Sequence, residues 1–158
     1  MTRQNRKKEH LEFALKCKAS PVGSGFSDLF PVYEALPELD LDQVDTSFSF
    51  LGKNLRAPLL INAMTGGHQD VKEINRSLAR AAARTGTAMA VGSQTAGLED
   101  AKVRDTYRVA RDENPDGVLL ANLSASASPD MADEAAAMVD ADGIQLHLNL
   151  AQELAMAE

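Results

Sequence analysis

Four residues near the carboxyl end of the sequence have side chains suited to ligand binding and proton transfer. His147 and Asn149 are two positions apart, so both side chains share one face if this stretch is a β-strand. Gln152 and Glu153 follow directly. The Glu153 carboxylate can hold Mg²⁺, which takes one or two protein carboxylates together with phosphate and water oxygens. The same carboxylate can instead stabilise the start of a helix, and the residue types leave both interpretations open.

A second group of candidate residues lies in the turn formed by residues 63–67, directly after the apolar run 58–62. Gly66 and Gly67 have no Cβ, so backbone N–H groups there can approach a flat or phosphorylated ligand closely. Thr65 adds a hydroxyl that donates and accepts hydrogen bonds. A plain strand-to-helix turn would also use glycine here. This turn is therefore a candidate cofactor site only if ligand-binding residues at other strand ends lie beside it.

The elements that must position these residues follow from hydrophobic periodicity. Apolar runs of strand length lie at 59–63, 88–92, 118–123 and 143–149, and apolar residues at helical spacings of three and four lie between them. The order is βαβαβαβ. Near-continuous apolar strands joined by amphipathic helices indicate a parallel sheet with right-handed crossovers. Either a doubly wound sheet or part of a β/α barrel satisfies this pattern.

Polar residues stand at the end of each predicted strand. In both architectures the ligand site forms at the carboxyl edge of the parallel strands, so these four groups are expected to converge. Helix capping is the alternative role for Thr65, Ser93, Asn122 and Asn149 taken singly. Capping does not require His147, Gln152 or Glu153. The candidate residues at and just beyond the four strand ends are Met64, Thr65, Ser93, Gln94, Thr95, Asn122, Ser124, His147, Asn149, Gln152 and Glu153.

Residues 1–57 form a separate amino-terminal region, and residues 58–158 form the periodic domain. Residues 1–18 hold six Lys or Arg against two Glu. Arg6, Lys7 and His10 share a face if this stretch is helical, which suits an anionic ligand, although a solvated basic tail fits the charge pattern as well. Alternation over 46–51, a turn at 52–54 and an apolar continuation over 55–61 predict a short hairpin.

The overall composition narrows the class of protein. A chain of 158 residues, 44% hydrophobic and 25% charged, suits one globular domain, and a single cysteine excludes an internal disulfide. The net charge of −7 argues against general nucleic-acid binding. No signal peptide and no apolar stretch of membrane length is apparent. We therefore expect a cytoplasmic protein without membrane or nucleic-acid partners.

Taken together, the motifs resemble those of type 2 isopentenyl-diphosphate isomerase, in order over essentially the whole chain. The resemblance rests on residues 6–10, 35–39, 57–67, 92–94, 122–124 and 147–153. It implies an FMN-dependent (β/α)8 TIM barrel that interconverts isopentenyl diphosphate and dimethylallyl diphosphate in isoprenoid biosynthesis. It also implies reduced FMN, Mg²⁺ and NADPH as the reductant that primes the flavin.

The resemblance also implies roles for individual residues. Gln152 would be the catalytic residue, orienting the substrate or relaying a proton, and Glu153 would coordinate Mg²⁺. The implied FMN contacts are Ala63, Met64, Thr65, Ser93 and Asn122. The implied substrate contacts are Arg6, Lys7, His10, Ser93, Gln94, Thr95, His147, Asn149 and Gln152, although many relatives carry Arg at the position of Thr95.

Chain length departs from this family pattern. Only the first four β/α units are present, whereas a closed barrel needs eight in about 250 residues. We expect the amino-terminal half of such an enzyme, with exposed sheet edges that favour pairing into a homo-oligomer. The alternative is a truncated, non-catalytic half-barrel that serves as an interaction module. A different flavin chemistry, such as 2-hydroxy-acid oxidation, lacks the Arg and His pair that it needs.

Overall fold

The computed structural model describes residues 15–16 and 23–148 of the chain. Its regular elements lie between residues 26 and 147. The strands are β1 (Phe48–Phe50), β2 (Lys53–Leu55), β3 (Leu60–Ile61), β4 (Ala88–Ala90), β5 (Leu119–Ser124) and β6 (Gly143–His147). The α-helices are α2 (Lys72–Thr85), α3 (Thr95–Glu99), α4 (Asp105–Glu113) and α5 (Pro129–Val139). Short 3-10 helices span Phe26–Asp28, Leu41–Gln43, Gln69–Val71 and Ala101–Val103.

The central sheet has four parallel strands in the order β3-β4-β5-β6. All four predicted strands are confirmed in type and order in the described part of the chain; β3, β4 and β6 are shorter than predicted, and β5 is shifted by one residue. β5 is buried along most of its length because it has a paired strand on each side. Because neighbouring strands are parallel, their carboxyl ends meet at one edge of the sheet.

The helices form one layer against one face of this sheet, and the predicted amphipathic patterns are confirmed. The main apolar cluster joins Ala79 and Ala82 of α2, Tyr107 and Ala110 of α4, and Ala135 and Val139 of α5 to the strands. The strand residues in this cluster are Met89, Val91, Leu119, Ala121 and Leu123. Small alanines on the helices let the helix backbones lie close to the sheet. The core is mainly aliphatic, as the composition predicts.

The opposite face of the sheet is covered in part by the β1-β2 hairpin. Leu55, with Phe50 beside it, packs on Ala88, Ala90 and Leu120 in a second, smaller cluster. The hairpin was predicted with its turn at residues 52–54, and that position is wrong. Phe50 pairs with Lys53, so the turn consists of residues 51 and 52, both at positive φ. The turn was misplaced because leucine rarely adopts positive φ.

The predicted (β/α)8 barrel is also wrong for this chain. The described residues form an open four-stranded sheet, in which β3 and β6 are edge strands without a partner on their outer sides. Barrel closure requires every strand to pair on both sides. The four β/α units that are present therefore build a small α/β sheet with one helical layer, together with a separate two-stranded antiparallel sheet.

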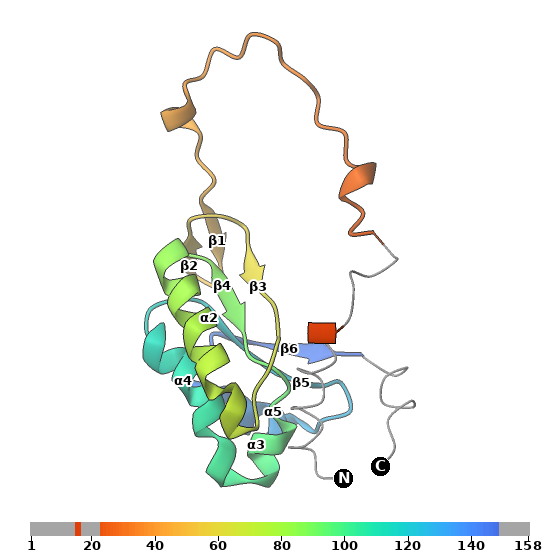
Figure 1. The fold of residues 1–158 in the computed structure, drawn as a ribbon, viewed down its shortest axis with the longest axis vertical. Coiled ribbons are helices and arrows are strands. Elements are labelled where there is room, and N and C mark those ends of the chain that lie inside the picture. The colour runs from red at the N-terminus through yellow and green to blue at the C-terminus, as the bar shows by residue number, and fades with distance from the viewer. Residues whose placement is uncertain (1–14, 17–22, 149–158) are drawn as a thin grey trace.

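The segment before the hairpin stands apart from this body. Every residue from 23 to 47 is exposed, and Figure 1 shows the segment extending well away from the sheet and helices. It carries many apolar side chains that are more than half exposed, including Phe26, Phe30, Val32, Tyr33, Leu36 and Leu41. The segment thus contributes no side chain to either apolar cluster.

Candidate functional site

The carboxyl edge of the sheet brings together the turns that follow β3, β4 and β5 with the end of β6. The Gly92 amide donates to the carbonyl of Thr65 at 3.0 Å, which joins the first two turns. The Gln94 amide donates to the carbonyl of Asn122 at 2.9 Å, which joins the second and third. The predicted convergence of these strand ends is therefore present for the described residues.

Gln94 ties two of these turns to the helical layer. Its side chain is fully buried, its Nε2 donates to the carbonyl of Ala135 at 2.8 Å, and its Oε1 accepts from the Asn122 amide at 2.9 Å. Both ends of the carboxamide are thus used inside the protein. In this structure Gln94 fixes the backbone around Asn122, and its predicted substrate contact stays a prediction.

Asn122 and His147 form a side-chain pair across β5 and β6. The Nδ1 of His147 lies 2.8 Å from the Oδ1 of Asn122, while the Nδ2 of Asn122 donates to the Oε1 of Gln145 at 3.4 Å. Because an amide oxygen only accepts, the neutral His147 ring carries its hydrogen on Nδ1 in this assignment. Its Nε2 is then left as a proton acceptor.

Gln145 is a site residue that the sequence analysis did not single out. Asn122 pairs with Gln145 and Ser124 with His147 in the strand register, so these four side chains lie on the face opposite the helices. The alternation that places His147 and Asn149 on one face also includes Gln145, two positions earlier. That spacing was the signal that could have identified it.

The two glycines after β3 owe their place to packing inside the protein. A Cβ on Gly66 would lie 2.0 Å from the Tyr107 ring, and one on Gly67 would lie 2.6 Å from the Tyr107 hydroxyl. Both residues have positive φ, at 153° and 85°. The glycines were predicted to admit a cofactor, whereas here the Tyr107 ring from α4 occupies that side of the turn.

The remaining candidates at this edge differ in accessibility. Met64 is 68% exposed, whereas Thr65 is buried. Ser93 and Thr95 are half-buried, with their hydroxyls 3.2 Å apart. Ala63 is half-buried as well. Ala63, Met64, Ser93 and Thr95 thus offer accessible surface, while Thr65 and Asn122 lie beneath it.

The remaining predicted residues lie outside the described part of the chain. These are the basic residues Arg6, Lys7 and His10 and the carboxyl-terminal group Asn149, Gln152 and Glu153. Among residues 15–16 and 23–148, no group of three His, Cys, Asp or Glu side chains could hold a metal ion. The predicted Mg²⁺ ligand Glu153 is not among the residues covered by that statement, and its role stays a prediction.

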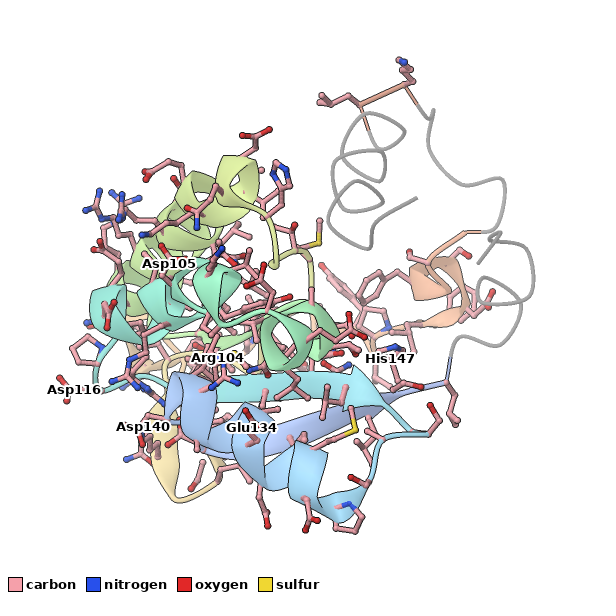
Figure 2. All side chains as sticks on the ribbon, turned by 90° about the horizontal axis from the view of Figure 1, so that it is seen from below. Arg104, Asp105, Asp116, Glu134, Asp140 and His147 are labelled. Carbon is pink, nitrogen blue, oxygen red and sulfur yellow. The ribbon has the colours of Figure 1, made fainter. Side chains whose placement is uncertain are left out.

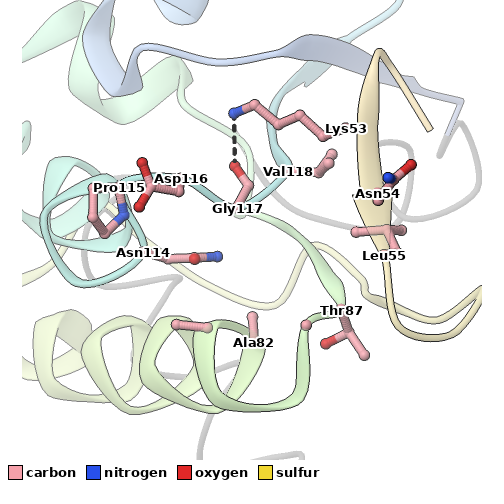
Figure 3. Close-up of a pocket in the computed structure, with 12 residues that line it drawn as sticks. Lys53, Asn54, Leu55, Ala82, Thr87, Asn114, Pro115, Asp116, Gly117 and Val118 are labelled. Carbon is pink, nitrogen blue, oxygen red and sulfur yellow. Dashed lines mark hydrogen bonds between the residues drawn. The ribbon is translucent and has the colours of Figure 1, made fainter. Parts of the chain in front are cut away.

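The amino-terminal edge of the sheet carries different chemistry. Figure 2 shows Asp116 and Asp140 at the end of the molecule opposite His147. A cavity of about 270 Å³ lies there between the hairpin, the end of α2 and the α4-β5 loop (Figure 3). At its wall the ammonium of Lys53 donates to the Gly117 carbonyl at 3.1 Å and pairs with Asp142 at 2.6 Å. Lys53 therefore links the hairpin to this edge of the sheet.

Burial and hydrogen bonding act on Asp142 in opposite directions. Burial raises the pKa of this carboxyl, while hydrogen bonds from Lys53, the Leu119 amide and Arg111 lower it. The net effect is a pKa below the ordinary value. Asp142 is thus held as a carboxylate, and this edge is a structural ion-pair cluster.

Comparison with known proteins links the chain to one activity. No family model matches it. The chain is 49% identical over 156 residues to isopentenyl-diphosphate delta-isomerase of Moorella thermoacetica, covering 99% of this chain and 44% of the relative. It is 48% identical to the protein of the same name from Symbiobacterium thermophilum, covering 99% of this chain and 45% of the relative. The protein of that name from Halobacterium salinarum is 45% identical, covering 98% and 45%.

These comparisons correct the type assignment made from the sequence. The chain spans about half the length of the curated relatives it matches, so the relatives are roughly twice as long as this chain. Their names state the isomerase and give neither a type nor a flavin. The assignment to the FMN-dependent type 2 family is therefore wrong as stated and is withdrawn. What the comparisons show is similarity to part of proteins named isopentenyl-diphosphate delta-isomerase.

None of the helices in the described part of the chain is long and apolar enough to cross a membrane. The longest of them, α2, has 14 residues and a polar outer face. A membrane-spanning helix needs about 20 predominantly apolar residues.

Proposed function

We propose that this chain provides substrate-binding and proton-handling residues for the interconversion of isopentenyl diphosphate and dimethylallyl diphosphate. The observation that carries the proposal is the hydrogen-bonded group Asn122, Gln145 and His147 at the carboxyl edge of the sheet. The identity to isopentenyl-diphosphate delta-isomerases over 98–99% of the chain supports the same reaction. Since the chain spans less than half of those proteins, activity of the chain by itself is part of the proposal.

The reaction is a 1,3-proton shift with no net redox change. One proton is added to an end of the three-carbon unit, another leaves the opposite end, and the double bond moves between them. Asn122 fixes the His147 tautomer by accepting from Nδ1, so the Nε2 atom is the side-chain nitrogen that can accept a proton. We assign His147 a binding or proton-holding role beside the substrate.

The diphosphate requires positive charge, which the described strand ends lack. We propose that Arg6, Lys7 and His10 bind the diphosphate and that Ser93, Thr95 and Asn149 contact it or the substrate nearby. Glu153 would hold Mg²⁺ on the diphosphate oxygens. Gln152 would orient the reacting end of the substrate, since a neutral amide is a poor base.

We further propose reduced FMN as the cofactor, with NADPH as its reductant. Ala63, Met64 and Ser93 have accessible surface at the strand ends, which fits the edge or face of a flat ring. Thr65 and Asn122 are buried and would support that surface from below. When bound, reduced flavin supplies a group that can donate or accept the migrating proton.

Two tests separate these proposals. Isothermal titration of isopentenyl diphosphate, with Mg²⁺ present, measures substrate binding to the 158-residue chain. Incubation with FMN, Mg²⁺ and NADPH, followed by detection of dimethylallyl diphosphate, measures turnover. We expect binding that His147→Ala weakens about tenfold, which corresponds to the loss of one good hydrogen bond. Asn54→Ala, on the exposed side of β2 at the far end of the sheet, is the matched control.

The outcomes distinguish the substrate from the cofactor. No binding of isopentenyl diphosphate would contradict the proposed function. Binding and turnover without flavin would contradict only the FMN proposal. A visible absorption spectrum of the purified protein, taken before any addition, detects flavin that copurifies.

A second candidate is a non-catalytic half-domain that associates with another chain. The observation favouring it is the exposure of apolar side chains on the edge strands, namely Leu60 on β3 and Ile144 and Leu146 on β6. We propose a homo-oligomer in the cytoplasm for either candidate. Substrate binding without turnover, together with self-association, would favour this second role.

A further inference from the structure

A buried set of polar side chains connects the helical layer to the turns of the candidate site. The Nδ2 of Asn75, on α2, donates to the carbonyl oxygens of Thr65 and Thr106 at 3.0 and 2.8 Å. The hydroxyl of Thr106, on α4, accepts from the Gly67 amide at 2.8 Å. The hydroxyl of Tyr107 donates to the Ser93 carbonyl at 2.8 Å. Asn75, Thr106 and Tyr107 each have no exposed surface.

The atoms that this set holds belong to the backbone of two strand-end turns. Three of them are the Thr65 carbonyl, the Gly67 amide and the Ser93 carbonyl. Buried backbone groups need partners. The Thr65 carbonyl also accepts from the Gly92 amide of the neighbouring turn at 3.0 Å. The helix side chains supply further partners, and in doing so they help to set the path of both turns.

The Tyr107 ring also fills the space beneath the first turn. Added Cβ atoms on Gly66 and Gly67 would lie 2.0 and 2.6 Å from this side chain, which means that the turn rests directly on it. Burial raises the pKa of the Tyr107 phenol well above its ordinary value, so the hydroxyl remains a neutral donor. The same side chain thus touches the turn after β3 and the turn after β4.

We propose that Asn75, Thr106 and Tyr107 are positioning residues, which hold the two turns so that Met64 and Ser93 face the ligand. Met64 is the residue before Thr65, and its 68% exposure follows from Thr65 being held inward. Ser93 presents its side chain while its carbonyl is held by Tyr107. This inference rests on the proposed function, because it names residues that act on the same site without touching the substrate.

The first test removes single atoms from this set. Tyr107→Phe keeps the ring beneath the glycines and deletes only the hydroxyl. Its matched control is Tyr33→Phe, because Tyr33 is the other tyrosine and is exposed. We expect Tyr107→Phe to lower kcat/KM, or the affinity for isopentenyl diphosphate, about three- to tenfold, the range for one neutral hydrogen bond. Tyr33→Phe should leave both unchanged.

The second test uses rescue by a conservative variant. Thr106→Val deletes the acceptor for the Gly67 amide, whereas Thr106→Ser restores a hydroxyl. We expect the valine variant to lose affinity as Tyr107→Phe does and the serine variant to recover at least half of the loss. If Thr106 only filled the core, the Thr106→Val and Thr106→Ser variants would bind the ligand with similar affinity when their thermal stability is equal.

Amide hydrogen exchange keeps the inference testable if the wild-type chain does not bind the substrate. The Gly67 amide should exchange at least tenfold faster in Thr106→Val, and the Gln94 amide should shift in the NMR spectrum of Tyr107→Phe. Failure of wild-type binding would then count against the proposed function alone. Unchanged Gly67 and Gln94 amides, or lower thermal stability with unchanged ligand affinity where the wild type binds, would overturn the positioning role.

Discussion

Arg111 joins three segments at the amino-terminal edge of the sheet. Its guanidinium donates to carbonyl oxygens of the loop at residues 114–117, to the Asp140 carbonyl and to the Asp142 carboxylate. The residue is only 5% exposed, so these partners replace water almost completely. A planar, permanently charged fork is suited to such a set of acceptors.

We expect Arg111→Met to reduce the free energy of unfolding by about 1–3 kcal/mol, because several buried carbonyls lose their donor while Asp142 keeps Lys53 and the Leu119 amide. Arg108→Met is the matched control. Arg108 lies on the exposed side of the same helix and pairs with Asp112 at 3.4 Å, an exposed pair worth less than about 1 kcal/mol. Urea unfolding followed by circular dichroism measures both. Equal losses for the two variants would contradict the role of Arg111.

The lowered pKa of Asp142 predicts a dependence of stability on pH. A carboxyl whose folded-state pKa lies below its unfolded value stabilises the fold above the unfolded value, about 3.9. That contribution is lost as pH falls through the folded-state pKa. We expect the wild type to lose stability below about pH 4 with a slope up to about 1.4 kcal/mol per pH unit steeper than Asp142→Asn. Unfolding in urea between pH 6 and 2.5 measures the difference, and parallel curves would refute it.

At the scale of single elements, the turn after β3 shows how glycine is used. Gly67 has a φ of 85°, and a Cβ there would lie within 2.8 Å of both Tyr107 and Ala96. Gly52, in the hairpin turn, has a φ of 77° but no atom within 4 Å of an added Cβ. Substitutions at the two positions therefore separate the cost of positive φ, which both share, from the cost of crowding, which applies only at Gly67.

We expect Gly52→Ala to cost about 1 kcal/mol, the strain of a left-handed residue. Gly67→Ala should cost about 2–4 kcal/mol, because crowding against Tyr107 adds to the same strain. Thermal unfolding of both variants measures the difference. A smaller loss for Gly67→Ala than for Gly52→Ala would show that the turn can move away from the ring.

The elements were predictable from the sequence where periodicity was strong. The four parallel strands and the helices α2, α4 and α5 follow from local patterns of apolar residues. The short helix α3 was missed because five residues give no periodic signal. The turn at Leu51 was misplaced because its positive φ is set by strand pairing and not by residue preference.

The site was predictable only in part, for a related reason. The convergence of strand ends follows from the topology of parallel strands, so Ser93, Asn122 and His147 could be grouped from the sequence. The partner of Gly66 could not, because Tyr107 lies 41 positions later on another helix. Packing between distant elements leaves no trace in the local sequence around either residue.

At the scale of the whole molecule, the sheet has one covered face and two open edges. The Ile144 and Leu146 side chains of β6 lie on the helical side of the sheet and are 38% and 54% exposed. An unpaired edge strand with exposed apolar side chains promotes association between chains. The (β/α)8 barrel was implied by the family resemblance, and the described residues form an open four-stranded sheet instead.

We expect the wild-type chain to self-associate and the double variant Ile144→Thr, Leu146→Thr to shift that equilibrium toward monomer at least tenfold. Threonine retains strand propensity while removing apolar surface. Leu36→Thr, Leu41→Thr is the control, since both leucines are exposed in the segment before the hairpin. Sedimentation velocity over a range of concentrations measures the change. Equal effects of the two double variants would mean that the sheet edge does not drive association.

The exposed segment at residues 23–47 has a consequence for how the chain withstands digestion. Its backbone is reachable along its whole length, whereas the backbone from β4 to α5 is enclosed by the two apolar clusters. Proteolytic cleavage concentrates where the chain is accessible and unpaired, so the two regions should be cleaved at different rates. Brief treatment with chymotrypsin, which cleaves after the Phe, Tyr and Leu residues of this segment, should therefore trim the chain back toward the hairpin and leave the sheet and its helices as one resistant fragment.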